Sequence, residues 1–181
     1  MCGGELPRGA RRSARAEPAG REEEFRLPAL SACAHVPTGP PPDYDGTIAN
    51  LEPAGEFAPA ELKGRVILVQ FFATWCFPCL GAFPELIHVE NAYADRGLTV
   101  VAVGMDLEGA LVLGPFAERE QPPFPVLIAD DLIRSGQSAF GKIPEVPVSY
   151  LIGRDGKLLA AWPGLVGAKR LESGIEEALA K

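Results

Sequence analysis

The amino-acid sequence predicts an α/β fold in which helices flank a central mixed β-sheet. Two apolar runs, 66–72 and 98–105, are each long enough for a buried strand, and a segment with helical spacing follows each of them. Later in the chain, two strand-like segments flank the turn sequence RDG, and an amphipathic segment closes the chain. Strand–helix alternation followed by a hairpin and a terminal helix is typical of an α/β sandwich.

The first strand–helix–strand unit has clear boundaries. Residues 66–72 (VILVQFF) form a run that fits a buried central strand. Residues 76–97 are expected to be helical and to end at Gly97. Their apolar side chains follow helical spacing at Leu80, Phe83, Leu86 and Ile87. Pro84 is expected to interrupt and kink this helix, because proline has no amide donor. The second strand follows at 98–105 (LTVVAVGM).

The remaining elements are shorter. Residues 107–120 predict a weaker helix that contains Gly114 and Pro115, two poor helix formers. The other expected elements are a strand at 124–130, a helical turn or two at 132–140, hairpin strands at 148–153 and 157–162, and a terminal helix at 169–181. No internal repeat is visible.

Composition excludes several classes of protein. The chain has 181 residues, of which 47% are hydrophobic and 23% charged, so one ordinary domain can bury a core. A net charge of −7 argues against nucleic acid as a partner, because phosphate binding needs clustered Lys and Arg. Four cysteines do not make a disulfide-dense scaffold. No segment has the roughly 20 consecutive apolar residues of a membrane-spanning helix.

The N-terminal segment differs from the rest. Residues 1–43 hold seven of the 18 prolines and lack apolar periodicity, so we expect a mobile tail there and one domain at 44–181. Two patterns in the tail are compatible with a lipid anchor: MCGG, with Cys2, and LSAC, which ends at Cys33. However, the residues before LSAC are REEEFRLPA rather than an apolar stretch, so no signal peptide is recognised and a plain tail is favoured.

The strongest chemical signal is the segment FFATWCFPCLGAFPEL at 71–86. Cys76 falls where a buried strand meets a helix, and unpaired amides at a helix N-terminus favour an anion such as a thiolate. We therefore expect Cys76 to be the attacking sulfur. Cys79, one turn later, is expected to be less exposed and to resolve the mixed disulfide. Pro78 fits the first helical turn, where its missing N–H costs nothing.

Other interpretations of the cysteine pair fit the sequence less well. Two cysteines one turn apart can simply pack in a core. A zinc site needs four ligands, and most of the remaining Cys and His residues lie in the tail. Cu(I) binding normally adds a nearby Met or His, and the nearest histidine is His88, which fits a solvated helix face. A peroxidatic cysteine would require Thr74 at a different offset. The redox interpretation is favoured.

These motifs resemble the thioredoxin superfamily, and in particular its TlpA/ResA branch of bacterial thiol–disulfide oxidoreductases. The resemblance covers 44–181 and rests on ELKGRVILVQFFATWCFPC, GLTVVAVGMD, FPVLIADD and EVPVSYLIGRDGKLL. It implies a thioredoxin-like fold with a strand–helix insertion at about 110–140. It also implies a redox-active Cys76–Cys79 disulfide and a cis proline at Pro147, next to the strand, rather than at Pro144.

The resemblance further implies how the site works. Trp75, Phe77, Pro78, Val146 and Pro147 are expected to contact the substrate around the sulfur. No metal or organic cofactor is expected, because electrons pass between this chain, protein thiol or disulfide substrates and an electron-donor redox protein. The implied setting is a monomeric reductase in the periplasm or cell envelope, with cytochrome c maturation as one role; a cytoplasmic location is the alternative. The alternative function is a thioredoxin-fold binding module, either a Cu(I) metallochaperone or a holdase.

Two positions depart from the family pattern. Ala82 occupies the place where the branch commonly has Glu, three residues after the second cysteine, and Gln70 occupies the place of the buried Asp of thioredoxins. Either carboxylate would accept the proton of the resolving thiol. We therefore expect Cys79 to deprotonate slowly and a mixed disulfide through Cys76 to be long-lived. Water, Glu145 or the substrate thiolate are the candidate acceptors.

Overall fold

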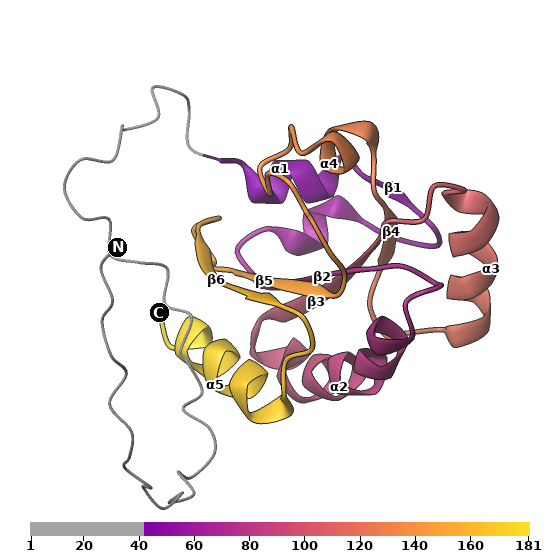
Figure 1. Cartoon of the computed structure of the whole chain (residues 1–181). Helices are drawn as coiled ribbons and strands as arrows, with labels where there is room; N and C mark the ends of the chain where they lie inside the picture. Colours follow the sequence, from indigo (N-terminus) through magenta and orange to yellow (C-terminus); the bar gives the residue numbers. More distant parts are fainter. Residues whose placement is uncertain (1–41) are drawn as a thin grey trace, which may run out of the picture.

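A computed structural model describes residues 42–181, which fold around one mixed six-stranded sheet with strand order β1-β4-β3-β2-β5-β6 (Figure 1). The strands are β1 (Glu52–Pro53), β2 (Val66–Phe72), β3 (Leu98–Gly104), β4 (Val126–Ile128), β5 (Val148–Ile152) and β6 (Leu158–Pro163). The α-helices are α1 (Tyr44–Ala49), α2 (Phe77–Tyr93), α3 (Ala110–Glu120), α4 (Asp131–Ser135) and α5 (Ala168–Leu179). Two 3-10 turns, η1 (Pro59–Leu62) and η2 (Ala94–Arg96), complete the described elements.

The centre of the sheet consists of β2 and β3, in which every residue is buried. These strands pair in parallel, from Val66 opposite Leu98 to Phe72 opposite Gly104. Strand β4 continues the parallel part beside β3, whereas β5 runs antiparallel to β2 and β6 antiparallel to β5. The mixed sheet expected from the sequence is confirmed. Because β2 and β3 are parallel, their C-terminal ends lie at the same edge of the sheet.

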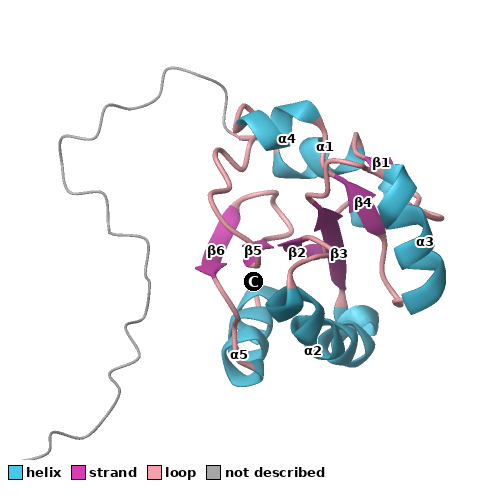
Figure 2. Ribbon diagram, turned by 45° about the vertical axis from the view of Figure 1, so that its right-hand side comes forward, coloured by secondary structure: helices cyan, strands magenta, loops and turns pink. Residues whose placement is uncertain are grey.

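Helices cover both faces of the sheet (Figure 2). Alternate β2 residues, such as Leu68 and Phe72, belong to the core layer that also contains side chains of α2, α3 and α5. The intervening residues, such as Ile67 and Phe71, pack in a second layer with side chains of α1 and α4. The nearly continuous apolar sequence of β2 is explained by this burial on two sides.

The predicted interruption of the first long helix is wrong. Helix α2 runs through Pro84 as one element, and α3 likewise runs through Pro115. Packing compensates for the lost hydrogen bond, since Phe83, Leu86 and Val89 of α2 are buried against the sheet. Helix α2 itself ends at Tyr93, and the 3-10 turn η2 continues the chain to the predicted stop at Gly97, whose left-handed φ of 103° suits glycine.

The N-terminal part of the domain contains elements that the sequence did not reveal. Helix α1 has six residues, and the Asp43 side chain caps it by accepting a hydrogen bond from the amide of Gly46 at 2.8 Å. Strand β1 has two residues and lies antiparallel to β4. Such short segments carry too little periodicity to be recognised. The predicted tail and its lipid-anchor motifs, at 1–43, lie almost wholly outside the described residues.

The insertion expected at about 110–140 is present between β3 and β5. It consists of α3, β4 and α4, and β4 extends the parallel part of the sheet. In the described part of the chain, no helix is long and apolar enough to span a membrane.

Candidate active site

Cys76 and Cys79 lie where β2 gives way to α2, as the sequence predicted. They form a disulfide, and their Cα atoms are 5.2 Å apart. Cys76 is the N-cap of α2, and its Sγ accepts a hydrogen bond from the backbone amide of Cys79 at 3.2 Å. The Cys76 carbonyl also accepts the first helical bond, from the amide of Leu80. The sulfur thus occupies the position where a helix N-terminus stabilises negative charge.

The two sulfurs differ in accessibility. Cys76 is 6% exposed, whereas Cys79 is completely buried. An incoming thiol or disulfide can therefore reach Cys76 first, which agrees with the order of attack expected from the sequence. Pro78 is exposed in the first turn of α2, where no amide donor is needed.

The Val146–Pro147 peptide bond is cis, as the resemblance implied. It lies beside the cysteines, since Sγ of Cys76 is 3.7 Å from the carbonyl oxygen of Val146. The carbonyl of Pro147 is already engaged by the amide of Gly164 at 2.8 Å. Pro144, the rival position, is exposed three residues earlier. The structure thus brings together two segments 70 residues apart in sequence.

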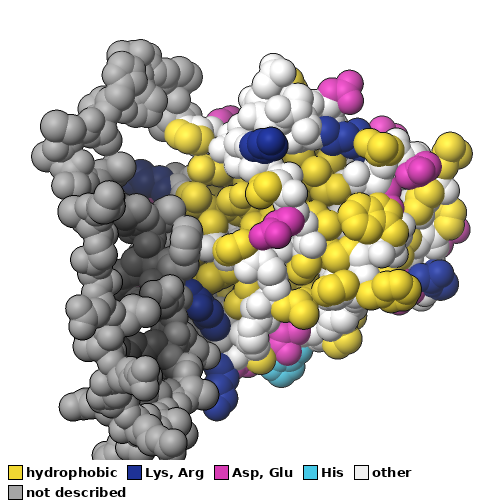
Figure 3. Space-filling view, viewed as in Figure 1, with side chains coloured by type: hydrophobic (Ala, Val, Ile, Leu, Met, Phe, Trp, Pro, Cys, Tyr) yellow, Lys and Arg dark blue, Asp and Glu magenta, His cyan; other side chains and the backbone are white. Residues whose placement is uncertain are grey.

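Large apolar side chains surround the disulfide at the surface. Trp75 and Phe77 are 69% and 86% exposed, in contrast to ordinary core aromatics. Leu107 and Leu111, which the sequence did not single out, are 84% and 83% exposed. Leu107 is close to this region in the chain's fold, because it follows Asp106, whose side chain binds the residue before Trp75, and Leu111 lies in the first turn of α3. Figure 3 shows hydrophobic side chains exposed over this face, on the side of the molecule where α3 lies.

A buried carboxylate holds the loop that leads to Cys76. Asp106 is 1% exposed, and its oxygens accept hydrogen bonds from Thr74: one from the hydroxyl at 2.6 Å and two from the amide at 3.1 and 3.2 Å. Sequence reasoning missed this residue. The signal that could have found it is an acidic residue directly after a buried strand that runs parallel to the strand preceding the cysteines.

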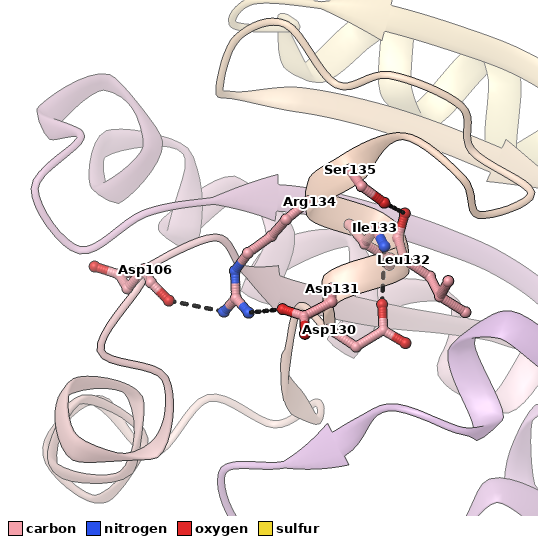
Figure 4. Close-up of polar contacts among 7 residues, drawn as sticks. All are labelled: Asp106, Asp130, Asp131, Leu132, Ile133, Arg134 and Ser135. Atoms are coloured by element: carbon pink, nitrogen blue, oxygen red, sulfur yellow. Dashed lines mark hydrogen bonds and ion pairs between the residues drawn. The ribbon is translucent and has the colours of Figure 1, made fainter.

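The insertion supports the same loop. Figure 4 shows Arg134 reaching from α4 to the segment that carries Asp106. Its guanidinium donates a hydrogen bond to the Asp106 carbonyl at 2.9 Å, and it lies 4.0 Å from the exposed carboxylate of Asp131. Helix α4 therefore contacts the loop before Cys76 through Asp106. Its own N-terminus is capped by Asp130, which accepts a hydrogen bond from the amide of Ile133.

The two departures from the family pattern lie next to each other. Gln70 is buried in β2, and its side-chain oxygen accepts a hydrogen bond from the hydroxyl of Ser149 at 2.6 Å. Gln70, Ser149 and Ala82 line one small cavity between the sheet and α2. Glu145, one candidate proton acceptor, is exposed on the loop before Val146. Within 42–181, no group of three or more His, Cys, Asp or Glu residues is arranged to hold a metal ion.

Comparisons with known proteins agree on one family. The Redoxin family model matches residues 43–167. Thiol-disulfide oxidoreductase ResA of Bacillus thuringiensis is 28% identical over 119 residues, which are 65% of each chain. Thioredoxin-like protein YneN of Bacillus subtilis is 28% identical over 118 residues, which are 64% of this chain and 66% of YneN. The match thus spans just under two thirds of the length of these relatives.

Solved structures show the same fold. A thiol:disulfide interchange protein from Chlorobium tepidum superposes with a TM-score of 0.60 at 29% identity, over 71% of this chain and 90% of its own. A putative thioredoxin from Neisseria meningitidis gives a TM-score of 0.59 at 29% identity, over 67% and 79%. The fold is thioredoxin-like, as the sequence resemblance implied.

Proposed function

Because the chain belongs to the Redoxin family, we propose that it is a thiol–disulfide oxidoreductase that exchanges electrons with protein partners through Cys76 and Cys79. The observation that carries this proposal is the disulfide at the N-terminus of α2, with one sulfur near the surface and the other buried. Relatives named thiol-disulfide oxidoreductases support it.

The arrangement supports a two-step exchange. In the reduced protein, the Cys76 thiolate attacks a substrate disulfide, a mixed disulfide forms, and one substrate sulfur leaves as a thiolate. Cys79 then attacks Sγ of Cys76, the mixed disulfide breaks, and the second substrate sulfur leaves with the electron pair of that bond. The substrate is reduced by two electrons, and the cysteine pair is oxidised. The Cys79 amide, 3.2 Å from Sγ of Cys76, stabilises the attacking thiolate.

We propose that the direction of work is reduction and that the setting is the bacterial cell envelope, where an electron-donor redox protein restores the dithiol. The resemblance to the TlpA/ResA branch and the ResA relatives support this assignment. Apocytochrome thiols are one candidate client.

The exposed apolar residues around the disulfide are proposed to bind the substrate. Trp75 and Phe77 flank Cys76, Val146 presents its carbonyl to the sulfur, and Leu107 and Leu111 extend the apolar surface. Of the two prolines that the sequence also places in this rim, Pro78 is exposed and Pro147 is buried. Replacing both leucines with Ser should raise the KM for an unfolded protein substrate by at least about 10-fold, or about 1.4 kcal/mol, since full burial of a single Leu contributes roughly 1.5–3 kcal/mol. Reduction of a small disulfide such as cystine should be unchanged; equal loss for both substrates would contradict this role.

The deciding experiment measures the reduction potential of the pair in a chain whose Cys2 and Cys33 are replaced by Ser. A value near −270 mV, as in thioredoxin, supports a reductase, whereas one near −120 mV indicates an oxidant of folding proteins. Cys76→Ser should abolish reduction of insulin, and Cys79→Ser should accumulate a mixed disulfide. A holdase would keep client binding in Cys76→Ser, and a Cu(I) carrier would take up one equivalent of the metal that blocks both thiols. Either result without disulfide exchange would overturn the proposal.

A further inference from the structure

One turn of the chain contains both an anchor of the cysteine loop and an exposed apolar residue, and the role in substrate binding argued for it rests on the proposed function. Asp106 is 1% exposed, and its carboxylate binds Thr74, which lies two residues before Cys76. The next residue, Leu107, is 84% exposed. A single peptide bond therefore separates a buried anchor from a side chain that is proposed to contact the substrate. Any contact that orients this peptide also orients Leu107.

The backbone around this peptide forms a closed turn. The amide of Gly109 donates a hydrogen bond to the carbonyl oxygen of Asp106 at 3.2 Å, so Leu107 and Glu108 are the central residues of a β-turn. Gly109 has a φ of 54° and a ψ of −126°, a conformation that suits glycine. Helix α3 begins directly after this residue and has no side-chain N-cap. The turn is thus closed by one hydrogen bond at the long end of the usual range.

Arg134 of α4 donates a second hydrogen bond to the same carbonyl oxygen of Asp106, at 2.9 Å (Figure 4). A carbonyl oxygen has two lone pairs, so it accepts both donors. Among the described residues, this is the only hydrogen bond that reaches the backbone of 106–109 from outside the turn and α3. The insertion therefore fixes the orientation of the Asp106–Leu107 peptide through one side chain.

The place of the Arg134 side chain is unfavourable unless this hydrogen bond compensates for it. The side chain is only 23% exposed, and its Nε is buried without a hydrogen-bond partner in the described part of the chain. A buried N–H group without an acceptor costs free energy. The other contact of the guanidinium, 4.0 Å from the carboxylate of Asp131, involves a fully exposed partner and contributes little. The Asp106 carbonyl is thus the contact that explains why the guanidinium lies here.

We propose that Arg134 is a positioning residue for substrate binding, which holds the Asp106–Leu107 peptide so that Leu107 is ordered before a substrate arrives. A binding residue that is already ordered loses less conformational freedom on association. The substrate class that this arrangement favours is an unfolded polypeptide with exposed apolar side chains, because a small polar disulfide has little apolar surface for Leu107 to bury. Since Arg134 acts through Leu107, its loss weakens the binding of such substrates and leaves the chemistry at Cys76 unchanged.

The test measures oxidation of the reduced chain, with Cys2 and Cys33 replaced by Ser, by an excess of scrambled ribonuclease A or of cystine. Samples are quenched with acid, and the remaining thiols are counted by alkylation and mass. The dependence of the rate on substrate concentration gives a half-saturating concentration and a maximal rate. Arg134→Met should raise the half-saturating concentration of scrambled ribonuclease A by about 3–10-fold, the cost of ordering one side chain at an interface. It should leave the maximal rate, and the rate with cystine, unchanged.

Three matched variants make the result specific. Arg134→Lys keeps a positive charge and a donor, so it should recover most of the binding, because the carbonyl needs only one donor from α4. Arg119→Met removes an exposed arginine from α3, changes the net charge equally, and should behave as the parent. Leu107→Ser should weaken binding by itself, and adding Arg134→Met to it should cause no further rise, since residues that act through one contact are not additive.

The proposal is overturned if Arg134→Met leaves the half-saturating concentration of the protein substrate at the parent value. It is also overturned if this substitution weakens binding equally in the Leu107→Ser background, because Arg134 would then act independently of Leu107. Equal slowing with cystine, or failure of both Arg134 variants to fold, would show a merely structural role and contradict the proposal. If neither substrate oxidises the cysteine pair of the parent chain, the proposed function itself fails.

Discussion

The hydrogen bonds between Thr74 and Asp106 should be essential for the loop that presents Trp75 and Cys76. Thr74→Val removes the hydroxyl donor 2.6 Å from the Asp106 carboxylate while keeping the size and branching of the side chain. A hydrogen bond to a charged acceptor contributes about 1.5–3 kcal/mol, so the free energy of unfolding should fall by about 2 kcal/mol. For a chain of this size, the melting temperature should decrease by about 4–8 °C.

The assay is urea unfolding of the oxidised protein, with insulin reduction by the reduced protein in parallel. Thr74→Ser retains the hydroxyl and should stay within about 1 kcal/mol of the parent. Asp106→Ala leaves both the amide and the hydroxyl of Thr74 without their acceptor and should cost more than Thr74→Val, with lower activity because the loop before Cys76 loses its support. If Thr74→Val unfolds within about 0.5 kcal/mol of the parent, the loop is held by other contacts and this reasoning is refuted.

Further predictions concern packing and pH. Gly174→Ala would place a Cβ 2.9 Å from the ring of the buried Trp162 and should lower the free energy of unfolding by about 1–3 kcal/mol. Gly81→Ala, which has no atom within 4 Å of the new Cβ, should raise it by up to about 1 kcal/mol. Equal melting temperatures for the two variants would contradict the packing argument. Burial raises the pKa of the Glu90 carboxyl, an effect that its hydrogen bond from Val100 only partly offsets. Just above the ordinary glutamate pKa of 4.5, the folded state therefore holds a proton that the unfolded state releases, so this group's contribution to stability falls as pH rises. Relative to Glu90→Gln, the parent should lose stability in urea titrations as the pH rises above about 4.5; a constant difference would refute this.

The sequence predicted most of the regular structure because the information was local. The strand at 66–72 was identified with its observed bounds, since burial on both faces requires an apolar run of that length. The Cys-Phe-Pro-Cys motif and the Val146–Pro147 dipeptide were recognisable because each is a short contiguous pattern. The continuity of α2 through Pro84 was not predictable, because it depends on how much apolar surface the helix buries against the sheet.

Contacts between distant segments were set by the tertiary structure alone. Thr74 and Asp106 are 32 residues apart, and they meet because β2 and β3 pair in parallel and in register, so that the residues following each strand lie at one edge. Gln70 and Ser149 are 79 residues apart and oppose each other across the antiparallel pair of β2 and β5.

The sequence by itself therefore determined the fold class, the redox pair and the order in which the two sulfurs are reached. Only the tertiary structure decided that Asp106 binds Thr74 in the loop before that pair, that Leu107 is exposed next to Asp106, and that Glu85 lines the cavity beneath α2. The physical reason is that motifs and periodicity reflect the needs of neighbouring residues. A hydrogen bond across strands or a cavity between layers depends instead on strand register and on which faces the helices bury.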